Sequence, residues 1–302
     1  MQHVTKGFIE GRNAVEDINW TVPVGSIHGL IGANGAGKTT LLRLALGVLW
    51  PDHGDVRILG QHLDRDNAPE LRQRVLYVGT GTPAPVGWRV GEWVRYVSLL
   101  YERWDARWAQ RLIEALDIGP DQVIAHLSTG QRASLNLILA VSVRPDLLLL
   151  DEPTNGLDVV LRHQFQTLLM EMAAEEGNTV VLATHAIEDV ERITDTTTLL
   201  YQGRVVLQGE LDSLKTRLHR LQVVMPREWP DRFNHVPDIT AIEHRGHVAL
   251  VTVEGPIEPH INAFREAGAL LVEPVEMDLA EVVRALLERE GYTRESVRWN
   301  VL

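Results

Sequence analysis

The sequence predicts an α/β fold with a mostly parallel sheet and a helical insertion, followed by a small C-terminal α+β domain. Strand-length apolar runs alternate with helix-length segments up to residue 209, an order typical of a parallel sheet with helices on both faces. Between residues 90 and 116 a mostly helical stretch interrupts this alternation, and after residue 209 strands outnumber helices. We expect a first domain at 1–220, with the insertion at about 83–145, and a second domain at 221–302.

Apolar periodicity and turn residues predict the individual elements. An apolar strand at 27–31 leads through a glycine-rich turn to a helix at 38–47. The run at 147–150 contains only leucine, which is typical of a strand buried on both faces. The first domain also has expected strands at 55–59, 75–78 and 179–183 and expected helices at 131–143 and 159–176. The C-terminal part has expected helices at 211–221, 256–267 and 279–290 and expected strands at 222–225, 239–244, 247–254 and 270–275.

Composition narrows the classes of function. Apolar residues make up 45% of the 302 residues and charged residues 23%, which are globular values. The sequence contains no apolar run long enough for a spanning helix, no secretory signal and no cysteine, which is compatible with a reducing cytosol. Lysine and arginine total 29 against 41 aspartate and glutamate, for a net charge of −12. Because nucleic-acid binders are typically basic, we expect no nucleic-acid partner.

A phosphate-binding motif follows the first apolar strand. Residues 32–39 read Gly-Ala-Asn-Gly-Ala-Gly-Lys-Thr and fit G-x-x-x-x-G-K-[ST] between an expected strand and an expected helix. Such glycines let backbone N–H groups face phosphate oxygens, and the lysine adds a full charge. A glycine-rich turn without a ligand is the alternative. We expect a P-loop NTPase whose ATP contacts come from Gly32, Ala33, Asn34, Gly35, Ala36, Gly37, Lys38, Thr39 and Thr40, with the Thr39 hydroxyl on Mg²⁺.

The leucine strand ends in two carboxylates, Asp151 and Glu152. A buried strand can deliver Asp151 to the nucleotide, where it would hold Mg²⁺ directly or through water. Glu152 is suited to act as general base toward the attacking water. The alternative is a core strand with a solvated acidic end, and the upstream phosphate loop disfavours it.

A third motif, Leu-Ser-Thr-Gly-Gln at 127–131, precedes the expected helix at 131–143. It matches the signature L-S-G-G-Q of the ATP-binding cassette family at four of five positions, with Thr129 in place of the first glycine. The sequence resembles that family over about residues 4–215, with the motifs in family order. Taken alone, Ser128 is equally explained as a helix N-cap.

The resemblance implies roles for further residues. Ser128, Thr129, Gly130 and Gln131 would close over the γ-phosphate of ATP held by the opposite subunit, so the family works as a dimer around two ATP molecules. Asp158 lies in a segment similar to the family's D-loop, and His185 matches the histidine that contacts the γ-phosphate. Phe8 would stack on adenine. A structural histidine and a core phenylalanine are the alternatives for His185 and Phe8.

Two positions depart from the family pattern. After the expected strand at 75–78 the family has a glutamine that contacts Mg²⁺ and water, whereas here Thr80 occupies the matching place. Threonine is shorter, so we expect either slow hydrolysis or coupling to a partner through different contacts. The chain also offers only about four residues for the strand that precedes Phe8, so we expect either that this strand is shortened or that the given sequence starts late.

The resemblance also implies the partners. An integral membrane permease would receive a homodimer or heterodimer of such cassettes, held on the cytoplasmic, inner face of the cell membrane. Segment 85–93 would border the groove for the permease, and Trp88 and Trp93 either line this groove or fill the core of the insertion. The strand-rich C-terminal part is similar to the accessory domain of exporters, which favours export, or it serves for dimerisation or stability.

Two other classes of function remain as alternatives. One is a regulatory or weakly hydrolysing cassette that senses nucleotide, which Thr80 favours. The other is a non-transport cassette ATPase acting on ribosomes or DNA, which the acidic composition disfavours.

Overall fold

The computed structural model describes residues 1–9, 11–79, 84–116, 118–226 and 229–289. Contacts divide the chain into two compact units, an N-terminal unit at Met1–Gln208 and a C-terminal unit at Gly209–Leu302. The expected boundary at 220 differs from this division, because it falls inside β12 (Leu218–Val224). That strand pairs with one strand of the C-terminal unit along its whole length and with a second strand from Arg220 onward, so it belongs to the C-terminal unit.

The central sheet has six strands in the order β11-β10-β3-β9-β8-β7. The four pairings from β10 to β7 are parallel, which confirms the predicted α/β fold class. Its central strands are apolar and fully buried, as the leucine run predicted. The strands are β3 (Ile27–Ile31), β7 (Val75–Gly79), β8 (Leu147–Asp151), β9 (Thr179–Thr184), β10 (Thr196–Tyr201) and β11 (Arg204–Glu210).

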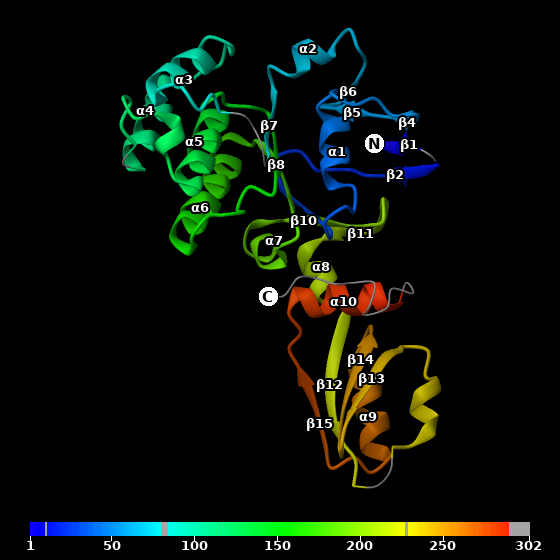
Figure 1. Cartoon of the computed structure of the whole chain (residues 1–302). Helices are drawn as coiled ribbons and strands as arrows, with labels where there is room; N and C mark the ends of the chain where they lie inside the picture. Colours follow the sequence, from blue (N-terminus) through cyan, green and yellow to red (C-terminus); the bar gives the residue numbers. More distant parts are fainter. Residues whose placement is uncertain (10, 80–83, 117, 227–228, 290–302) are drawn as a thin grey trace. The chain divides into compact units, whose positions relative to one another are not determined.

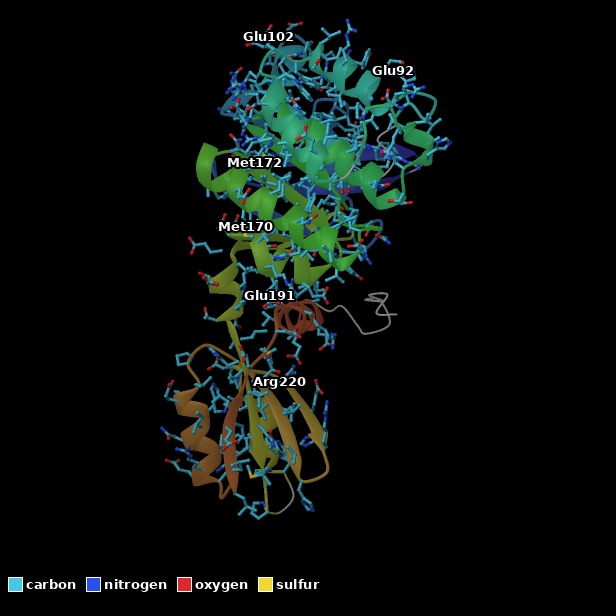
Figure 2. All side chains as sticks on the ribbon, turned by 90° about the vertical axis from the view of Figure 1, so that its left-hand side faces the viewer. Glu92, Glu102, Met170, Met172, Glu191 and Arg220 are labelled. Atoms are coloured by element: carbon cyan, nitrogen blue, oxygen red, sulfur yellow. The ribbon has the colours of Figure 1, made fainter. Side chains whose placement is uncertain are left out.

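Helices cover both faces of this sheet (Figure 1). On one face α1 (Lys38–Ala45) packs its leucines against alternate residues of β8 and β9. On the other face α5 (Thr129–Ser142) and α6 (Val159–Glu176) pack against the intervening residues of the same strands. Within α6, Met172 is buried whereas Met170 is exposed, so one side of the helix faces the core (Figure 2). The parallel sheet therefore lies between two layers of helices.

A second, antiparallel sheet with the order β2-β1-β4 extends the α1 side of the core. Its strands are β1 (Gln2–Ile9), β2 (Arg12–Ile18) and β4 (His53–Asp55). The expectation of a short first strand is wrong, since β1 has eight residues and includes Phe8. The expected strand at 55–59 is split, because β5 (Arg57–Ile58) leaves this sheet and pairs with β6 (Gln61–His62).

The helical insertion contains α3 (Val90–Ser98), α4 (Ala106–Ala115) and the 3₁₀ turn η1 (Ile124–His126), and it leads into α5. The helical stretch expected at 90–116 is broken in two, because Asp105 caps a new helix by accepting a hydrogen bond from the Trp108 N–H at 2.9 Å. Two short helices complete the unit, α2 (Ala68–Leu71) and α7 (Ile187–Ile193).

The C-terminal unit is an α+β unit with its own core. Its antiparallel sheet has the order β13-β14-β12-β15, with β13 (Ile239–Arg245), β14 (Val248–Glu254) and β15 (Leu271–Val275) beside β12. Phe264 of α9 (Glu258–Glu266) is fully buried against one face of this sheet. The remaining elements are α8 (Leu211–Lys215), the 3₁₀ turn η2 (Asp231–His235) and α10 (Leu279–Arg289). The helix expected at 211–221 is therefore shorter and gives way to β12.

Candidate nucleotide site

The phosphate loop connects β3 to α1 and depends on glycine at the positions where the backbone turns. Gly35 and Gly37 have φ angles of +79° and +110°, in the left-handed region that favours glycine. A Cβ atom at Gly37 would also lie 2.7 Å from the Ala14 carbonyl oxygen, and one at Gly32 would lie 2.6 Å from the Leu200 carbonyl oxygen. The loop can therefore adopt this shape only with glycine at these places.

Lys38 is the first residue of α1, and its side chain turns back over the loop. Its Nζ donates to the carbonyl oxygen of Gly32 at 2.6 Å and to that of Ala33 at 3.4 Å. The same Nζ lies 3.0 Å from Oε1 of Glu152. Because only 6% of the Lys38 side chain is exposed, this ammonium acts in a largely desolvated site, where its attraction to an anion is strong.

Glu152 follows β8 and connects Lys38 to His185. Its φ of +52° is unusual for a residue with a side chain and changes the direction of the backbone at the end of the strand. The Glu152 N–H donates to the Ala183 carbonyl oxygen at 2.8 Å. The Nδ1 atom of His185 lies 2.8 Å from Glu152 Oε2. Since a carboxylate can only accept, Nδ1 is the donor. Carboxylate, imidazole and ammonium thus form one connected group.

Asp151, the last residue of β8, is only 3% exposed and accepts two hydroxyl hydrogen bonds on Oδ2. Thr39 donates at 2.7 Å and Tyr77 donates at 2.9 Å. Burial, followed by the charge of Asp151 and the hydrogen bond to it, raises the pKa of Tyr77 to about 12. The tyrosine hydroxyl therefore keeps its proton at neutral pH and remains a donor.

Lys38, Asp151 and Glu152 line a pocket of about 350 Å³ at the carboxyl end of the parallel strands, whereas Tyr77 and His185 contact these residues from outside its lining. Ligands of α/β folds bind at this end of the sheet. Its lining residues are Ala14, Ala33, Asn34, Gly35, Ala36, Gly37, Lys38, Thr39, Thr40, Asp151, Glu152 and Asn155. The structure thus brings the phosphate loop and the acidic end of β8 together, as the sequence predicted.

The oxygen ligands at this pocket fit Mg²⁺. Thr39 and Asp151 offer a hydroxyl and a carboxylate that already lie within hydrogen-bond distance of each other. No group of three or more histidine or acidic side chains suited to a metal occurs in the part of the chain that the structure describes. Mg²⁺ commonly takes one or two protein oxygens and completes its shell with substrate phosphates and water, so this sparse set suits a cation that arrives with ATP.

The signature residues do not line this pocket. Ser128 caps α5, since its Oγ accepts from the Gln131 N–H at 3.1 Å and Gln131 Oε1 accepts from the Ser128 N–H at 3.1 Å. A Cβ atom at Gly130 would lie 3.1 Å from Cδ1 of Leu161 on α6, so any larger residue there would require Leu161 to shift. Asp158 caps α6 by accepting from the Leu161 N–H at 2.9 Å. Within one chain these residues have local capping roles.

Two further predicted positions stand apart from the pocket. Phe8 is 56% exposed on β1, which excludes the alternative of a core phenylalanine. Thr80 lies outside the described residues.

Sequence reasoning missed Tyr77 as a site residue, and it placed Asn155 only at the start of the segment similar to the D-loop. Tyr77 stands two positions before Gly79 on β7, and alternate residues of a strand face the same side. A tyrosine followed on the same face by glycine is the signal that could have found it. Asn155 directly follows the turn after Glu152 and lines the pocket.

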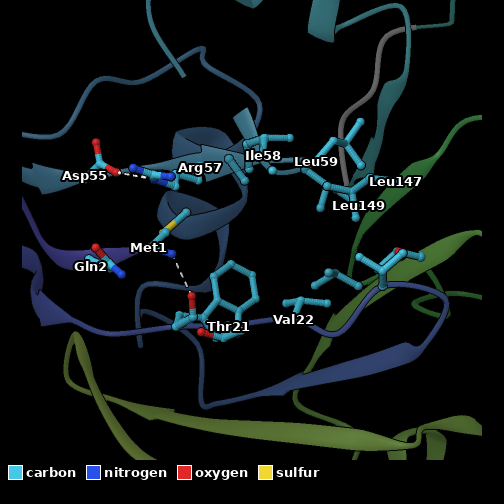
Figure 3. A pocket seen from close by; sticks show the side chains of 16 residues that line it. Met1, Gln2, Thr21, Val22, Asp55, Arg57, Ile58, Leu59, Leu147 and Leu149 are labelled. Atoms are coloured by element: carbon cyan, nitrogen blue, oxygen red, sulfur yellow. Dashed lines mark hydrogen bonds and ion pairs between the residues drawn. The ribbon is translucent and has the colours of Figure 1, made fainter. Parts of the chain in front are cut away.

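A different pocket of about 280 Å³ lies between β1 and the amino ends of β8 and β9 (Figure 3). Its walls are mostly apolar and include Trp20, Leu147 and Leu149. The Met1 amino group donates to the Trp20 carbonyl oxygen at 2.7 Å. None of its lining residues belongs to the phosphate loop or to the acidic end of β8, so it is separate from the nucleotide site.

Comparisons with known proteins show what this chain is similar to. The family model described as ABC transporter matches residues 15–155. The ABC transporter ATP-binding protein YtrB of Bacillus subtilis is 31% identical over 215 residues, covering 71% of this chain and 73% of that protein. The Nod factor export ATP-binding protein I of Cupriavidus metallidurans is 30% identical over 284 residues, which cover 91% of this chain and 93% of that protein.

A solved ATP-binding subunit of an ABC transporter superposes with a TM-score of 0.64 at 27% identity, covering 71% of this chain and 90% of that one. No helix in the described ranges is both long and apolar enough to cross a bilayer. The matched regions contain the phosphate loop and the acidic strand end described above. The chain belongs to the ABC transporter family, as one of its ATP-binding subunits.

Proposed function

We propose that this chain is the ATP-hydrolysing subunit of an exporter, in which two cassettes close around two ATP molecules and drive an integral membrane permease. The observation that carries the proposal is the connected group of Lys38, Glu152 and His185 beside the phosphate loop. In this group Lys38 supplies a cation that can bind the phosphates, and Glu152 supplies a base that can accept a proton from the attacking water. The subunit would then lie at the inner face of the membrane through its permease.

The first step is nucleotide binding. The glycines of the loop would offer N–H groups to the phosphate oxygens, and the ammonium of Lys38 would bind the β- and γ-phosphates. Phe8, exposed on β1, would stack on adenine. Thr39 and Asp151 would hold Mg²⁺, which when bound neutralises phosphate charge.

The second step is proton transfer from the attacking water. Glu152 would accept this proton, and the hydrogen bond from His185 Nδ1 would orient its carboxylate. In the family the histidine also contacts the γ-phosphate, and we carry that role to His185. Thr80 would occupy the place where the family has a glutamine.

The third step is dimer closure. Residues 128–131 do not line the pocket of their own chain, which supports their use on the ATP of a partner cassette, either a second copy or a homologous chain. ATP would join two cassettes, and hydrolysis would separate them and supply the mechanical stroke to the permease. The similarity to a Nod factor export protein supports export.

Two variants test the proposal. Lys38→Ala should abolish tight ATP binding, because it removes the charge aimed at the phosphates. Glu152→Gln should keep ATP binding and lower steady-state hydrolysis by about 10²-fold or more, because it removes the base. Glu188→Gln, on the exposed side of α7, serves as the matched control and should hydrolyse ATP like the parent.

Size-exclusion chromatography of Glu152→Gln in ATP should show a dimer. A Lys38→Ala chain that binds ATP like the parent would contradict the assignment of the phosphate loop. Parental hydrolysis by Glu152→Gln would contradict the assignment of the base.

A second candidate is a nucleotide-sensing cassette with slow turnover, which Thr80 favours. The same hydrolysis assay separates the two candidates, since a sensor would bind ATP tightly while the parent itself turned over slowly.

A further inference from the structure

Tyr77 reaches the nucleotide site from a neighbouring strand. It lies in the middle of β7, and its hydroxyl donates to Asp151 Oδ2 at 2.9 Å. In the parallel register Tyr77 pairs with Leu149, and Gly79 pairs with Asp151. The tyrosine ring therefore extends two residues along the strand direction to meet a carboxylate at the end of the next strand.

The path of the ring depends on Gly79. Tyr77 and Gly79 face the same side of β7 because side chains alternate along a strand. A Cβ atom at Gly79 would lie 2.1 Å from the Tyr77 hydroxyl oxygen and 2.5 Å from the ring carbon that carries it. Any other residue at 79 would displace the hydroxyl from its present position. The hydrogen bond to Asp151 and the missing side chain at 79 are two separate observations that agree.

Two hydroxyls hold the carboxylate of Asp151. Oδ2 accepts from Tyr77 and, at 2.7 Å, from Thr39. Thr39 belongs to the phosphate loop and itself contributes to the site, whereas Tyr77 packs with the apolar core beside α1 and does not line the pocket. The ring is thus anchored outside the pocket and only its hydroxyl acts on the site.

We propose that Tyr77 is a positioning residue for the divalent cation that accompanies ATP, because its hydroxyl fixes the orientation of the Asp151 carboxylate beside Thr39. This inference rests on the proposed function. Hydrogen-bond partners of metal-binding side chains orient them, and their removal commonly costs 10- to 100-fold in metal affinity. Because Thr39 would still hold Oδ2, we expect the lower end of that range.

The test measures cation binding directly in the full-length chain. Mn²⁺ is titrated by electron paramagnetic resonance in the presence of a non-hydrolysable ATP analogue. For Tyr77→Phe we expect the Mn²⁺ dissociation constant to rise about 10-fold. The affinity for the analogue in EDTA and the thermal midpoint without ligand should stay at the parental values, because the ring and the loop are intact. Tyr101→Phe removes a hydroxyl from another half-buried tyrosine and should leave all three quantities unchanged.

Gly79→Ala is the second variant, since it displaces the hydroxyl without removing it. We expect weaker Mn²⁺ binding here as well. Parental Mn²⁺ affinity in Tyr77→Phe or in Gly79→Ala would overturn the inference and leave the proposed function standing. Loss of cation-free nucleotide binding in Tyr77→Phe would also overturn it, because the role would then be structural. If the parent itself bound no Mn²⁺ with the analogue, the proposed function would fail.

Discussion

His28 is a buried histidine in β3 with both ring nitrogens hydrogen-bonded. The Trp20 indole N–H donates to Nε2 at 3.1 Å, and an indole nitrogen can only donate. Nε2 therefore accepts, and the proton of the neutral ring resides on Nδ1, which lies 2.7 Å from the Thr196 hydroxyl. Burial lowers the pKa of His28 from 6.5 to about 4.

This shift predicts loss of stability in mild acid. The unfolded chain binds a proton at His28 more readily than the folded chain, so folding stability is complete above pH 6.5 and falls as the pH drops toward 4. The free energy of unfolding should be about 2–3 kcal/mol lower at pH 4.5 than at pH 7.5 because of this one group. Urea denaturation at the two pH values measures the difference.

The matched variants are His28→Gln and His163→Gln, the latter on the exposed side of α6. The free energy of unfolding should differ less between the two pH values in His28→Gln than in the parent. In His163→Gln this difference should equal the parental one. An undiminished difference in His28→Gln would assign the acid sensitivity to other groups.

At the residue scale, contiguous motifs were predictable and contacts across strands were not. Lys38 and Asp151 each stand next to a recognisable strand, so the sequence alone placed them at one end of the sheet. The contact of Tyr77 with Asp151 was not predicted, because it depends on the register of β7 against β8 and on the absence of a side chain at Gly79. The left-handed backbone of Glu152 is likewise imposed by the surrounding structure, since no local signal predicts it.

At the scale of elements, α3 and the turn before it present a cluster of aromatic side chains. Trp88 packs edge-on against Trp93 and against Tyr96, with ring centroids 6.2 Å and 5.5 Å apart. Trp88 and Tyr96 are 40% and 44% exposed, whereas Trp93 is only partly exposed. Trp88 is therefore accessible to a partner, whereas Trp93 packs against the core of the insertion.

Trp88→Ala should weaken co-purification with the permease and leave ATP binding unchanged. Aromatic anchors contribute much of the binding energy at interfaces, and Trp88 does not line the nucleotide pocket. Met170→Ala on α6 is the control, because Met170 is also 40% exposed. Tagged chains isolated from membranes with the co-expressed permease give the readout. Full recovery of the permease with Trp88→Ala would place the coupling surface elsewhere.

The elements that were mispredicted share one physical cause, tertiary pairing. Residues 211–221 have a helical pattern, yet α8 ends at Lys215 because Leu218–Val224 pairs with strands on both sides. Strand β10 was not predicted, although it joins β3 in the parallel sheet. Pairing with distant strands overrides local preference in both cases, and a single sequence does not reveal such partners.

At the scale of the whole molecule, all residues of the proposed nucleotide site belong to the N-terminal unit, Met1–Gln208. The C-terminal unit has a separate core, in which Leu221, Val251 and Phe264 are fully buried. The alternation of strands and helices predicted the number and order of these units. It did not predict the division between Gln208 and Gly209, because a helical pattern at 211–221 masked the start of β12.

This division predicts that the fragment 1–208 folds and binds ATP by itself. Its dissociation constant for ATP should lie within about 3-fold of the full-length value, because every residue that lines the proposed nucleotide pocket belongs to this fragment. A fragment that ends at residue 220 is the matched comparison. It would carry α8 and three residues of β12, including Leu218, which is buried in the C-terminal unit and would be exposed to water.

We therefore expect the fragment 1–208 to be monodisperse and the fragment 1–220 to aggregate more readily, as measured by light scattering and by binding of a fluorescent ATP analogue. Exposed apolar segments that normally pair in a sheet promote such association. If the shorter fragment failed to fold while the longer one folded and bound ATP, residues 209–220 would be part of the nucleotide-binding unit. The sequence-based boundary at 220 would then describe the folding unit better than the contacts do.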